Sequence, residues 1–409
     1  MKNKNMKRAA CFVLSTLLLQ ACASNLERHP VPEDKLDGAG IPGIPDARIS
    51  LSGITFHSDE ASLDRFRGIF EKVDSLHDGA KRYPDFLAIS GGGAEGAFTA
   101  GLLNGWTDSG TRPVFQVVSG VSTGALIAPF AFLGSGYDDV LKILYTTSNT
   151  KSIMDRLGIF SIRKNSALAD TAPLREIIAA TVNAEFLAKV AAEHDKGRRL
   201  IIATTNLDSQ TPVVWNMGGI AKNGEPHTVQ LFRDVMLASA SIPGVFPPVI
   251  IEVESNGQRY DEMHVDGGVS KQVFAYPPGL NIAELQQQKG EDLGLTLYMI
   301  RNSKVLPEHE PVSMKLKDIA AISGTMLLRS QGNSNITETY EATLRDGIDF
   351  RFAYIPPEFG VESTEAFDQA YMKQLFELSY GMAVNGYPWL DHPPWYSDEI
   401  REVLLTEAD

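Results

Sequence analysis

A unit that occurs twice in the first third of the chain constrains the fold most: a short apolar strand, a glycine-rich turn and then an apolar helix. In the first unit, the strand FLAI at residues 86–89 precedes the turn SGGGAEGA and a predicted helix at 97–106. In the second, a strand at 114–118 runs into SGVSTG and another apolar helix. Strands that alternate with helices predict an α/β fold with a mainly parallel central sheet and helices on both faces.

The rest of the chain continues this alternation without an internal repeat or a low-complexity segment. Apolar stretches predict strands at 200–204, 212–215, 296–300 and 350–355, and a hairpin at 249–253 and 259–265. Helices are expected at about 314–330 and 366–384.

The second glycine turn contains a G-x-S-x-G match, Gly120-Val121-Ser122-Thr123-Gly124. A nucleophile elbow needs this place between a strand and a helix, because the sharp turn exposes the serine Oγ and the small glycines permit a strained backbone. Ser122 is therefore the candidate nucleophile. The alternative is a glycine-rich helix start in which Ser122 only caps the helix.

The first glycine turn, residues 91–96, also fits the pattern G-x-G-x-x-G. A dinucleotide site would need an acidic residue at the end of the second strand, about 20 residues on, but here that strand ends at the serine turn. The turn fits an oxyanion hole better, since bare glycine amides can donate to a developing negative oxygen without steric hindrance.

A serine nucleophile needs a base. The histidines after Ser122 lie outside any recognisable motif, although a triad with one of them stays an alternative; they are His194, His227, His264, His309 and His392. Asp266, in HVDGG at the end of a predicted strand, is the more specific candidate. By itself, Asp-Gly-Gly is typical of a turn.

Taken together, the segments Ser-Gly-Gly-Gly, G-x-S-x-G and Asp-Gly-Gly, in this order, resemble the patatin-like phospholipases. A fourth segment, LASASIPGVFPP at residues 237–248, is similar to that family's Ala-Ser-x-Ala-x-Pro-x-x-Phe-Pro-Pro stretch. The resemblance covers residues 85–280, which we interpret as the catalytic domain. Residues 281–409 resemble the C-terminal extensions of some bacterial members less distinctly, and we expect an α/β extension packed on the catalytic domain.

The resemblance implies a three-layer α/β/α fold and the hydrolysis of acyl esters in lipids or phospholipids, without a metal or an organic cofactor. It makes Ser122 the nucleophile and Asp266 its partner in a Ser–Asp dyad, with Gly92 and Gly93 as oxyanion amides. Glu95 departs from the family pattern, because many members have Arg or Lys there. The remaining motif glycines are Gly91, Gly96, Gly120, Gly124, Gly267 and Gly268.

The N-terminus has the anatomy of an export signal: four basic residues, a short apolar run and then Leu-Gln-Ala-Cys ending at Cys22. The run is too short to cross a bilayer. It resembles a bacterial lipoprotein signal, which predicts a signal peptide at 1–21 and lipidation of Cys22; an ordinary secretory signal is the alternative. Residues 22–50, rich in Pro and Gly, are expected to be a flexible tether.

The sequence also limits the partners and the location. With 37 basic and 51 acidic residues and a net charge of −14, the chain lacks the basic surface that a nucleic-acid partner needs. The expected partners are a lipid substrate and a membrane, reached through the lipid anchor. Ala23 and Ser24 follow the cysteine, so no acidic residue resembling an inner-membrane retention signal is present. In a two-membrane bacterium this predicts the outer membrane.

Three functions therefore compete. The first is a lipid acyl hydrolase with a Ser–Asp dyad, and the second is a serine esterase with a Ser-His-Asp triad. The third is a catalytically silent lipoprotein of the cell envelope.

Overall fold

A computed structural model of the chain describes residues 28–50, 85–157, 166–276, 280–284, 294–309 and 311–397. The predicted signal peptide and Cys22 lie outside these residues.

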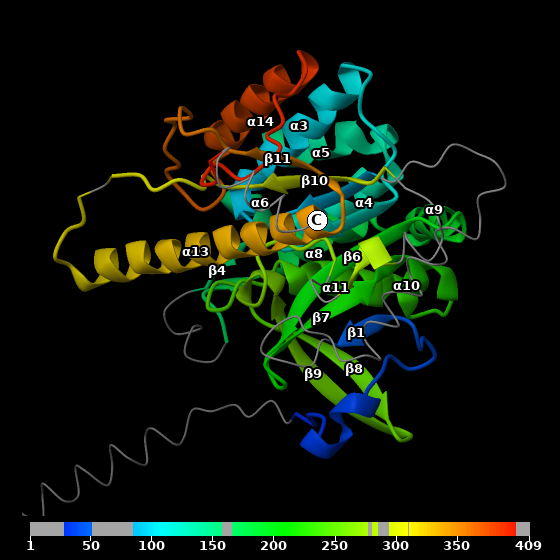
Figure 1. Ribbon diagram of the computed structural model, residues 1–409. Coiled ribbons are helices and arrows are strands. Elements are labelled where there is room, and N and C mark those ends of the chain that lie inside the picture. Colours follow the sequence, from blue (N-terminus) through cyan, green and yellow to red (C-terminus); the bar gives the residue numbers. More distant parts are fainter. Residues whose placement is uncertain are drawn as a thin grey trace, which may run out of the picture.

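A nine-stranded sheet lies in the middle of the molecule (Figure 1). Five neighbouring strands are parallel, in the order β6, β3, β2, β10, β11. The predicted α/β fold with a mainly parallel sheet is confirmed. The bounds of these strands are Arg199–Asn206 for β6, Val117–Gly120 for β3, Asp85–Ile89 for β2, Thr296–Arg301 for β10 and Asp349–Tyr354 for β11.

The sheet continues beyond β6 in antiparallel strands. β7 (Thr211–Asn216) pairs with β6 on one side and with β1 (Arg48–Ser50) on the other. The predicted hairpin is formed by β8 (Val249–Ser255) and β9 (Gln258–Asp266), and β9 also pairs with the end of β6. This pairing brings the end of β9, where Asp266 lies, to the same edge as the ends of the parallel strands.

Alternate side chains of the central strands enter two different cores, as the two-residue period of a strand requires. In β2, Leu87 and Ile89 belong to the larger core, whereas Phe86 and Ala88 belong to the second. The larger core includes side chains of α3 (Gly96–Asp108), α4 (Thr123–Leu133), α5 (Asp138–Thr147), α8 (Ala172–Thr181), α9 (Ala184–Asp195), α10 (Met217–Asn223), α11 (Thr228–Ser239) and α14 (Gln369–Val384). The second core includes Ile336 and Tyr340 of α13 (Leu316–Arg345). Helices therefore cover both faces, which gives the expected three layers.

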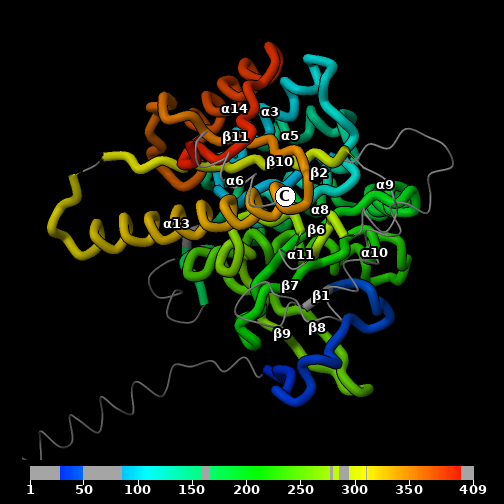
Figure 2. The backbone as a smooth tube through the Cα atoms, viewed as in Figure 1, coloured from blue at the N-terminus to red at the C-terminus, as the bar shows by residue number. Residues whose placement is uncertain are grey.

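Residues 28–50 differ from the flexible tether that the composition predicts. Figure 2 shows this segment in blue along the β8–β9 hairpin. Val31, Ile41 and Ile44 are buried in the larger core, and Arg48 forms a buried ion pair with Glu262 of β9. Apolar side chains spaced among the prolines and glycines thus hold the segment on the domain, so its described part is packed structure.

The described part of residues 281–409 completes the central sheet, since β10 lies between β2 and β11. α14 packs against α3 at Gly101 and Gly105, where a Cβ atom would come within 2.3 Å of the backbone of α14. Small residues on α3 therefore permit a close helix contact. The described part of this segment contains both helices and strands, and it is continuous with the sheet of residues 85–280.

The C-terminal aromatic residues pack on their own domain, with Trp389 against the larger core and Trp395 and Tyr396 against the second. Within the ranges that the structure describes, no helix is both long and apolar enough to span a membrane.

Candidate active site

Ser122 lies at the turn between β3 and α4, where the serine motif predicts a nucleophile elbow. Its backbone has φ 55° and ψ −123°, a conformation that is strained for a residue with a side chain. The Ser122 N–H donates to Ser239 Oγ at 3.0 Å, and Ser239 Oγ donates to the carbonyl of Ala203 on β6. Neighbouring elements therefore hold the strained turn in place.

The motif glycines permit the segments of the site to approach each other. At Gly120 and Gly124 an added Cβ would meet backbone oxygens at 2.3 Å, those of Gly124 and Ile89 respectively. At Gly96 it would meet Thr123 Oγ1 at 2.4 Å, and at Gly267 the carbonyl of Ala203 at 2.4 Å. The glycines of three separate motifs thus lie at the contacts between the strand ends.

Asp266 ends β9, and burial controls its charge. The side chain is 5% exposed, and its Oδ1 accepts a hydrogen bond of 2.7 Å from the Gly268 N–H. Oδ2 has no hydrogen-bond partner within the described residues. Burial raises the pKa of Asp266 to about 7, although the nearby Ser122 side chain and the Gly268 N–H act to lower it. The serine is therefore close enough to affect the carboxyl group without closing a regular hydrogen bond to Oδ2.

The glycine loop, residues 91–96, contains backbone N–H groups that have no acceptor among the described residues. Gly91 donates its N–H to Gln272 O at 3.0 Å, and its added Cβ would lie 3.1 Å from Ser122 Cβ. Gly92 and Gly93 have φ values of 156° and 58°, and their N–H groups donate to no group in the described part of the chain. The Thr123 N–H, at the start of α4, also has no acceptor there. This third amide was missed, although a residue that follows an elbow nucleophile commonly supplies one.

Asn302 fixes the glycine loop, and nothing in the sequence motifs identifies it. The side chain is fully buried and accepts hydrogen bonds from the N–H and Oγ1 of Thr99. Its own N–H and Nδ2 donate to Ser90, and its carbonyl lies 2.2 Å from where a Cβ on Gly92 would be. Any side chain at Gly92 would therefore displace the loop from β10.

Gln272 connects the Asp266 turn to the C-terminal part of the chain. Its Nε2 donates to Gly268 O at 2.8 Å, and its Oε1 accepts from Arg301 at 3.3 Å. The Gln272 N–H donates to Asn335 of α13 at 2.9 Å. A polar network from α13 and β10 thus stabilises the turn that carries Asp266, and its members are too far apart in sequence to be predicted.

Glu95 lies at the start of α3 and interacts electrostatically with the buried Arg301. Burial raises the pKa of Glu95 to about 7, while the charge of Arg301 and a 3.5 Å contact from Tyr371 OH act to lower it. Burial likewise lowers the pKa of Arg301 to about 10, and Glu95 acts to raise it. Arg301, at the end of β10, therefore partly balances the charge of Glu95, the residue that differs from the family's Arg or Lys.

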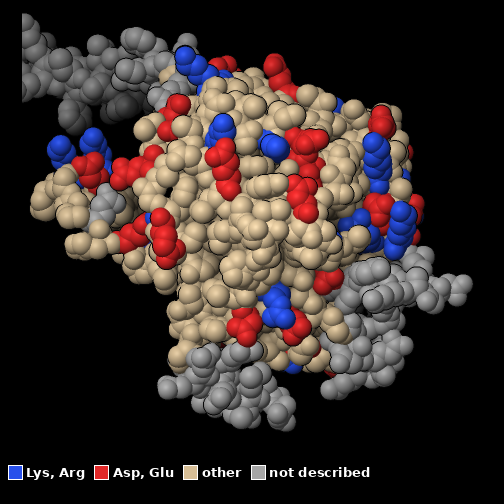
Figure 3. All heavy atoms as spheres, turned by 90° about the horizontal axis from the view of Figure 1, so that it is seen from above, with Lys and Arg blue, Asp and Glu red and all other residues tan. Residues whose placement is uncertain are grey.

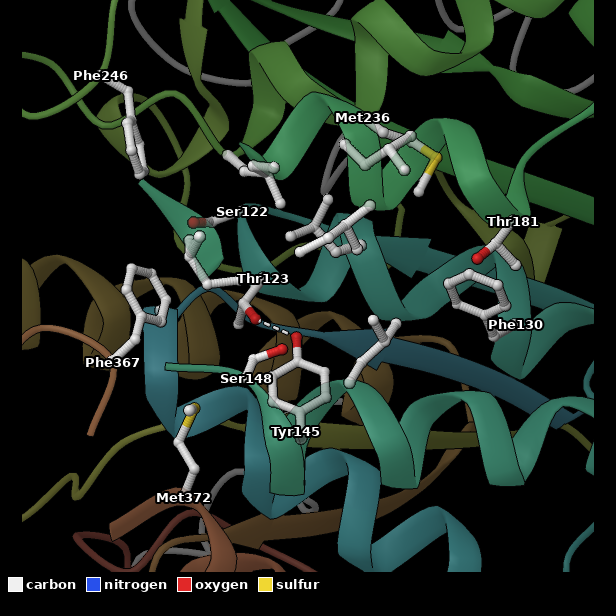
Figure 4. Close-up of a pocket in the computed structure, with 18 of the residues that line it drawn as sticks. Ser122, Thr123, Phe130, Tyr145, Ser148, Thr181, Met236, Phe246, Phe367 and Met372 are labelled. Atoms are coloured by element: carbon white, nitrogen blue, oxygen red, sulfur yellow. Dashed lines mark hydrogen bonds between the residues drawn. The ribbon is translucent and has the colours of Figure 1, made fainter. Parts of the chain in front are cut away.

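An elongated pocket extends from Ser122 between α4, α5, α8 and α11 (Figure 4). Its empty volume is about 830 Å³, which includes its open mouth. Phe246, Phe367 and Met372 lie at the Ser122 end, and Phe130 and Thr181 lie at the other. No charged side chain of the described residues lines it. The lining therefore suits an apolar group.

Tyr145 and Thr123 form the main polar contact inside the pocket, with 2.5 Å between their hydroxyl oxygens (Figure 4). Burial raises the pKa of Tyr145 above its ordinary value, so this hydroxyl stays protonated.

Histidine is absent from the described residues that line the pocket. His264, the histidine nearest to Asp266 in sequence, is fully buried with both ring nitrogens engaged: Nδ1 lies 2.9 Å from Thr204 Oγ1 and Nε2 lies 3.0 Å from Glu262. Burial would raise the pKa of Glu262, but hydrogen bonds from His264 and Arg48 lower it to about 2. His264 therefore stabilises β9 through Thr204 and Glu262, and the Ser-His-Asp triad alternative loses the histidine nearest to Asp266 in sequence.

In the described ranges, no cluster of three or more His, Cys, Asp or Glu could hold a metal ion.

The strand order, the strained serine turn and the glycine loop define an α/β protein with a candidate serine hydrolase site. Residues 87–277 match a family model described as patatin-like phospholipase.

A relative and a solved structure are also similar. The uncharacterized protein R571 of Acanthamoeba polyphaga mimivirus is 26% identical over 173 residues, which is 42% of this chain. The match covers 56% of that protein, so this chain spans about half the length of the relative. The crystal structure of VipD from Legionella pneumophila aligns with 77% of this chain and 69% of its own, at 12% identity and a TM-score of 0.36.

Proposed function

We propose that this protein is a serine acyl hydrolase that cleaves carboxylic esters of lipids, of the phospholipase A or general lipid esterase type. One observation carries the proposal: Ser122, on a strained strand-to-helix turn, lies at one end of an uncharged pocket and beside the buried carboxyl group of Asp266. The patatin-like match of residues 87–277 supports the same class of reaction.

In the proposed reaction, Ser122 Oγ attacks the ester carbonyl carbon while Asp266 takes the Oγ proton. A pKa of about 7 makes this carboxylate a stronger base than an ordinary aspartate, and it is still largely ionised slightly above neutral pH. The protonated Asp266 then gives the proton to the departing alcohol oxygen, which leaves an acyl-enzyme. Water attacks the acyl-enzyme in the same way and releases the fatty acid and free Ser122.

The negative oxygen of each tetrahedral intermediate would accept hydrogen bonds from the N–H groups of Gly92, Gly93 and Thr123, which have no acceptor among the described residues. Thr123 adds the dipole of α4, which is positive at its N-terminus. Gly93, Ser122 and Thr123 all line the pocket, so an acyl chain in the pocket would place its carbonyl near these donors.

Kinetics of point variants test this proposal. Ser122→Ala and Asp266→Asn should each reduce kcat/KM on a soluble short-chain ester by about 10³-fold or more, because each removes a group that acts in the transition state. The double variant should lose little more than either single one. Ser135→Ala and Asp139→Asn, both exposed positions outside the pocket, are the matched controls. Near-normal turnover by Asp266→Asn would exclude the dyad.

We further propose that the protein is a lipoprotein held on a membrane by acylated Cys22, at the outer membrane if the source has two membranes. The supporting observation is the Leu-Gln-Ala-Cys signal with Ala23 and Ser24 after it. One acyl chain binds marginally, whereas several hold a domain stably. Labelling with a palmitate analogue and membrane fractionation should find the label in the wild type and lose it in Cys22→Ser. An unlabelled, freely soluble wild type would refute the anchor.

A further inference from the structure

The outer half of α13 is an exposed apolar helix. Figures 1 and 2 show α13 projecting beyond the body of the molecule, with its first residues farthest out. Leu316 is 83% exposed and Leu327 is 72% exposed. Of the fourteen exposed large hydrophobic residues in the described chain, seven lie between residues 312 and 328. They are Val312, Met314, Leu316, Ile319, Met326, Leu327 and Leu328.

Val312 and Met314 precede α13, and the other five surround most of the helix. At 100° per residue, Leu316 and Leu327 share one side, Leu328 lies on a second, and Ile319 and Met326 lie on a third. A surface helix in water normally has a polar face toward the solvent. An exposed helix with apolar side chains on three sides instead marks a surface that contacts a partner or a membrane.

The charge of the segment is opposite to that of the whole chain. Residues 312–328 contain Lys315 and Lys317 but only one acidic residue, Asp318, whereas the chain carries −14. Figure 3 shows acidic and basic side chains interspersed over one face, without a large basic area. A basic apolar segment suits an anionic lipid surface. Two copies of it would bring like charges together, so a lipid surface fits better than a second copy.

The same helix reaches the catalytic turn at its inner half. Gln331 donates to the carbonyls of Val269 and Ser270, which follow Asp266, and Asn335 accepts from Gln272. Val269 is itself 45% exposed. Ile242, which lines the pocket, is 38% exposed, and its neighbour Ser241 accepts the Asp266 N–H. Exposed apolar side chains thus occur both on the outer helix and at the turns around Asp266.

We infer that residues 312–328, which comprise the outer half of α13 and the short segment before it, are an interfacial docking surface that inserts into the surface of an anionic lipid bilayer. It holds the pocket of Ser122 at the layer where ester bonds of lipids lie. This inference rests on the proposed function for its purpose, but the docking itself is a binding event that is measured without hydrolysis.

The test uses the full chain carrying Cys22→Ser, so that no acyl anchor contributes, and a triple variant Leu316→Glu/Leu327→Glu/Leu328→Glu. Glutamate is a good helix former, and all three positions are exposed, so the fold should be retained. Ile143→Glu, at a 59% exposed position on α5, is the matched control. Binding is measured by co-sedimentation with vesicles of 3:1 phosphatidylcholine and phosphatidylglycerol.

Each inserted leucine should contribute about tenfold to partitioning, so the triple variant should bind these vesicles about 1000-fold more weakly. The control should bind like its parent, and all forms should hydrolyse a soluble short-chain ester equally. Vesicle binding that the triple variant retains overturns the inference. A parent dimer that the triple variant converts to monomer, with vesicle binding unchanged, also overturns it, in favour of a second copy.

The failure of the proposed function is a separate result. If the parent binds vesicles through α13 but hydrolyses no ester, the docking surface stands and the enzymatic proposal falls. If the parent hydrolyses soluble esters but the triple variant binds vesicles as the parent does, the enzymatic proposal stands and the docking surface falls.

Discussion

Replacing Asp266 by Asn should make the protein more stable at alkaline pH while removing its activity. The native site keeps a carboxylate in a buried place, with Oδ2 lacking a partner within the described residues. An amide carries no charge to desolvate, and its oxygen can still accept the Gly268 N–H. The same burial that makes Asp266 a useful base therefore costs folding free energy.

The pKa shift gives the size of the effect. Burial raises the pKa of Asp266 from 3.8 to about 7. Because the folded state holds this proton more tightly, the cost is absent when both states are protonated at low pH, grows between about pH 4 and 7, and is complete above pH 7. At about 1.4 kcal/mol per pKa unit, the cost is about 1 kcal/mol at pH 4.5 and about 4 kcal/mol at pH 8.

Urea unfolding of wild type and Asp266→Asn at both pH values measures this difference. The stability of the variant relative to wild type should increase by about 3 kcal/mol from pH 4.5 to pH 8. Asp208→Asn is the control of opposite sign, because hydrogen bonds from Arg28 lower the pKa of Asp208. Because Asp208 is already largely ionised in both states at pH 4.5, that variant should be less stable than wild type by nearly the same amount at both pH values. A relative stability of Asp266→Asn that does not depend on pH would refute the raised pKa.

Three further results are expected. The kcat/KM of the wild type on a soluble ester should rise as pH increases through about 7 and then level off, as Asp266 ionises; a flat profile between pH 5 and 8 would count against this base. Gly92→Ala should abolish activity, because its Cβ would strike Asn302, whereas Gly93→Ala, with open space around it, should keep more; equal losses would contradict the loop geometry. Thr181→Trp, at the far end of the pocket, should reduce hydrolysis of long-chain esters at least tenfold more than that of butyrate esters, and an equal effect on both would show that the acyl chain binds elsewhere.

The sequence predicted those parts of the fold that depend on local patterns. The apolar strands with glycine turns correctly marked β2, β3 and the helices after them, and period-two patterns marked the β8–β9 hairpin. The serine and aspartate motifs were expected to meet, and strand pairing does bring Asp266 to the edge where Ser122 lies. Their catalytic roles stay predictions.

The parts that could not be predicted depend on long-range contacts. Composition alone predicted a flexible tether that includes residues 28–50. The burial of Ile41 and Ile44 could not be predicted, because it depends on a surface formed by distant strands. Asn302 and Gln272 belong to no sequence motif. Asn302 can hold the glycine loop because β10 lies beside that loop, and Gln272 can hold the Asp266 turn because α13 lies beside that turn. A free aspartate would be a weak base, and only the folded environment raises its pKa.

Covalent capture of Ser122 tests the central claim most directly. A fluorophosphonate reacts with an activated serine and leaves a stable adduct that peptide mapping by mass spectrometry locates. The account predicts a single adduct on the peptide containing Ser122, slower labelling of Asp266→Asn, and no labelling of Ser122→Ala. An unlabelled wild type, or an adduct on another serine with full activity left in Ser122→Ala, would contradict it.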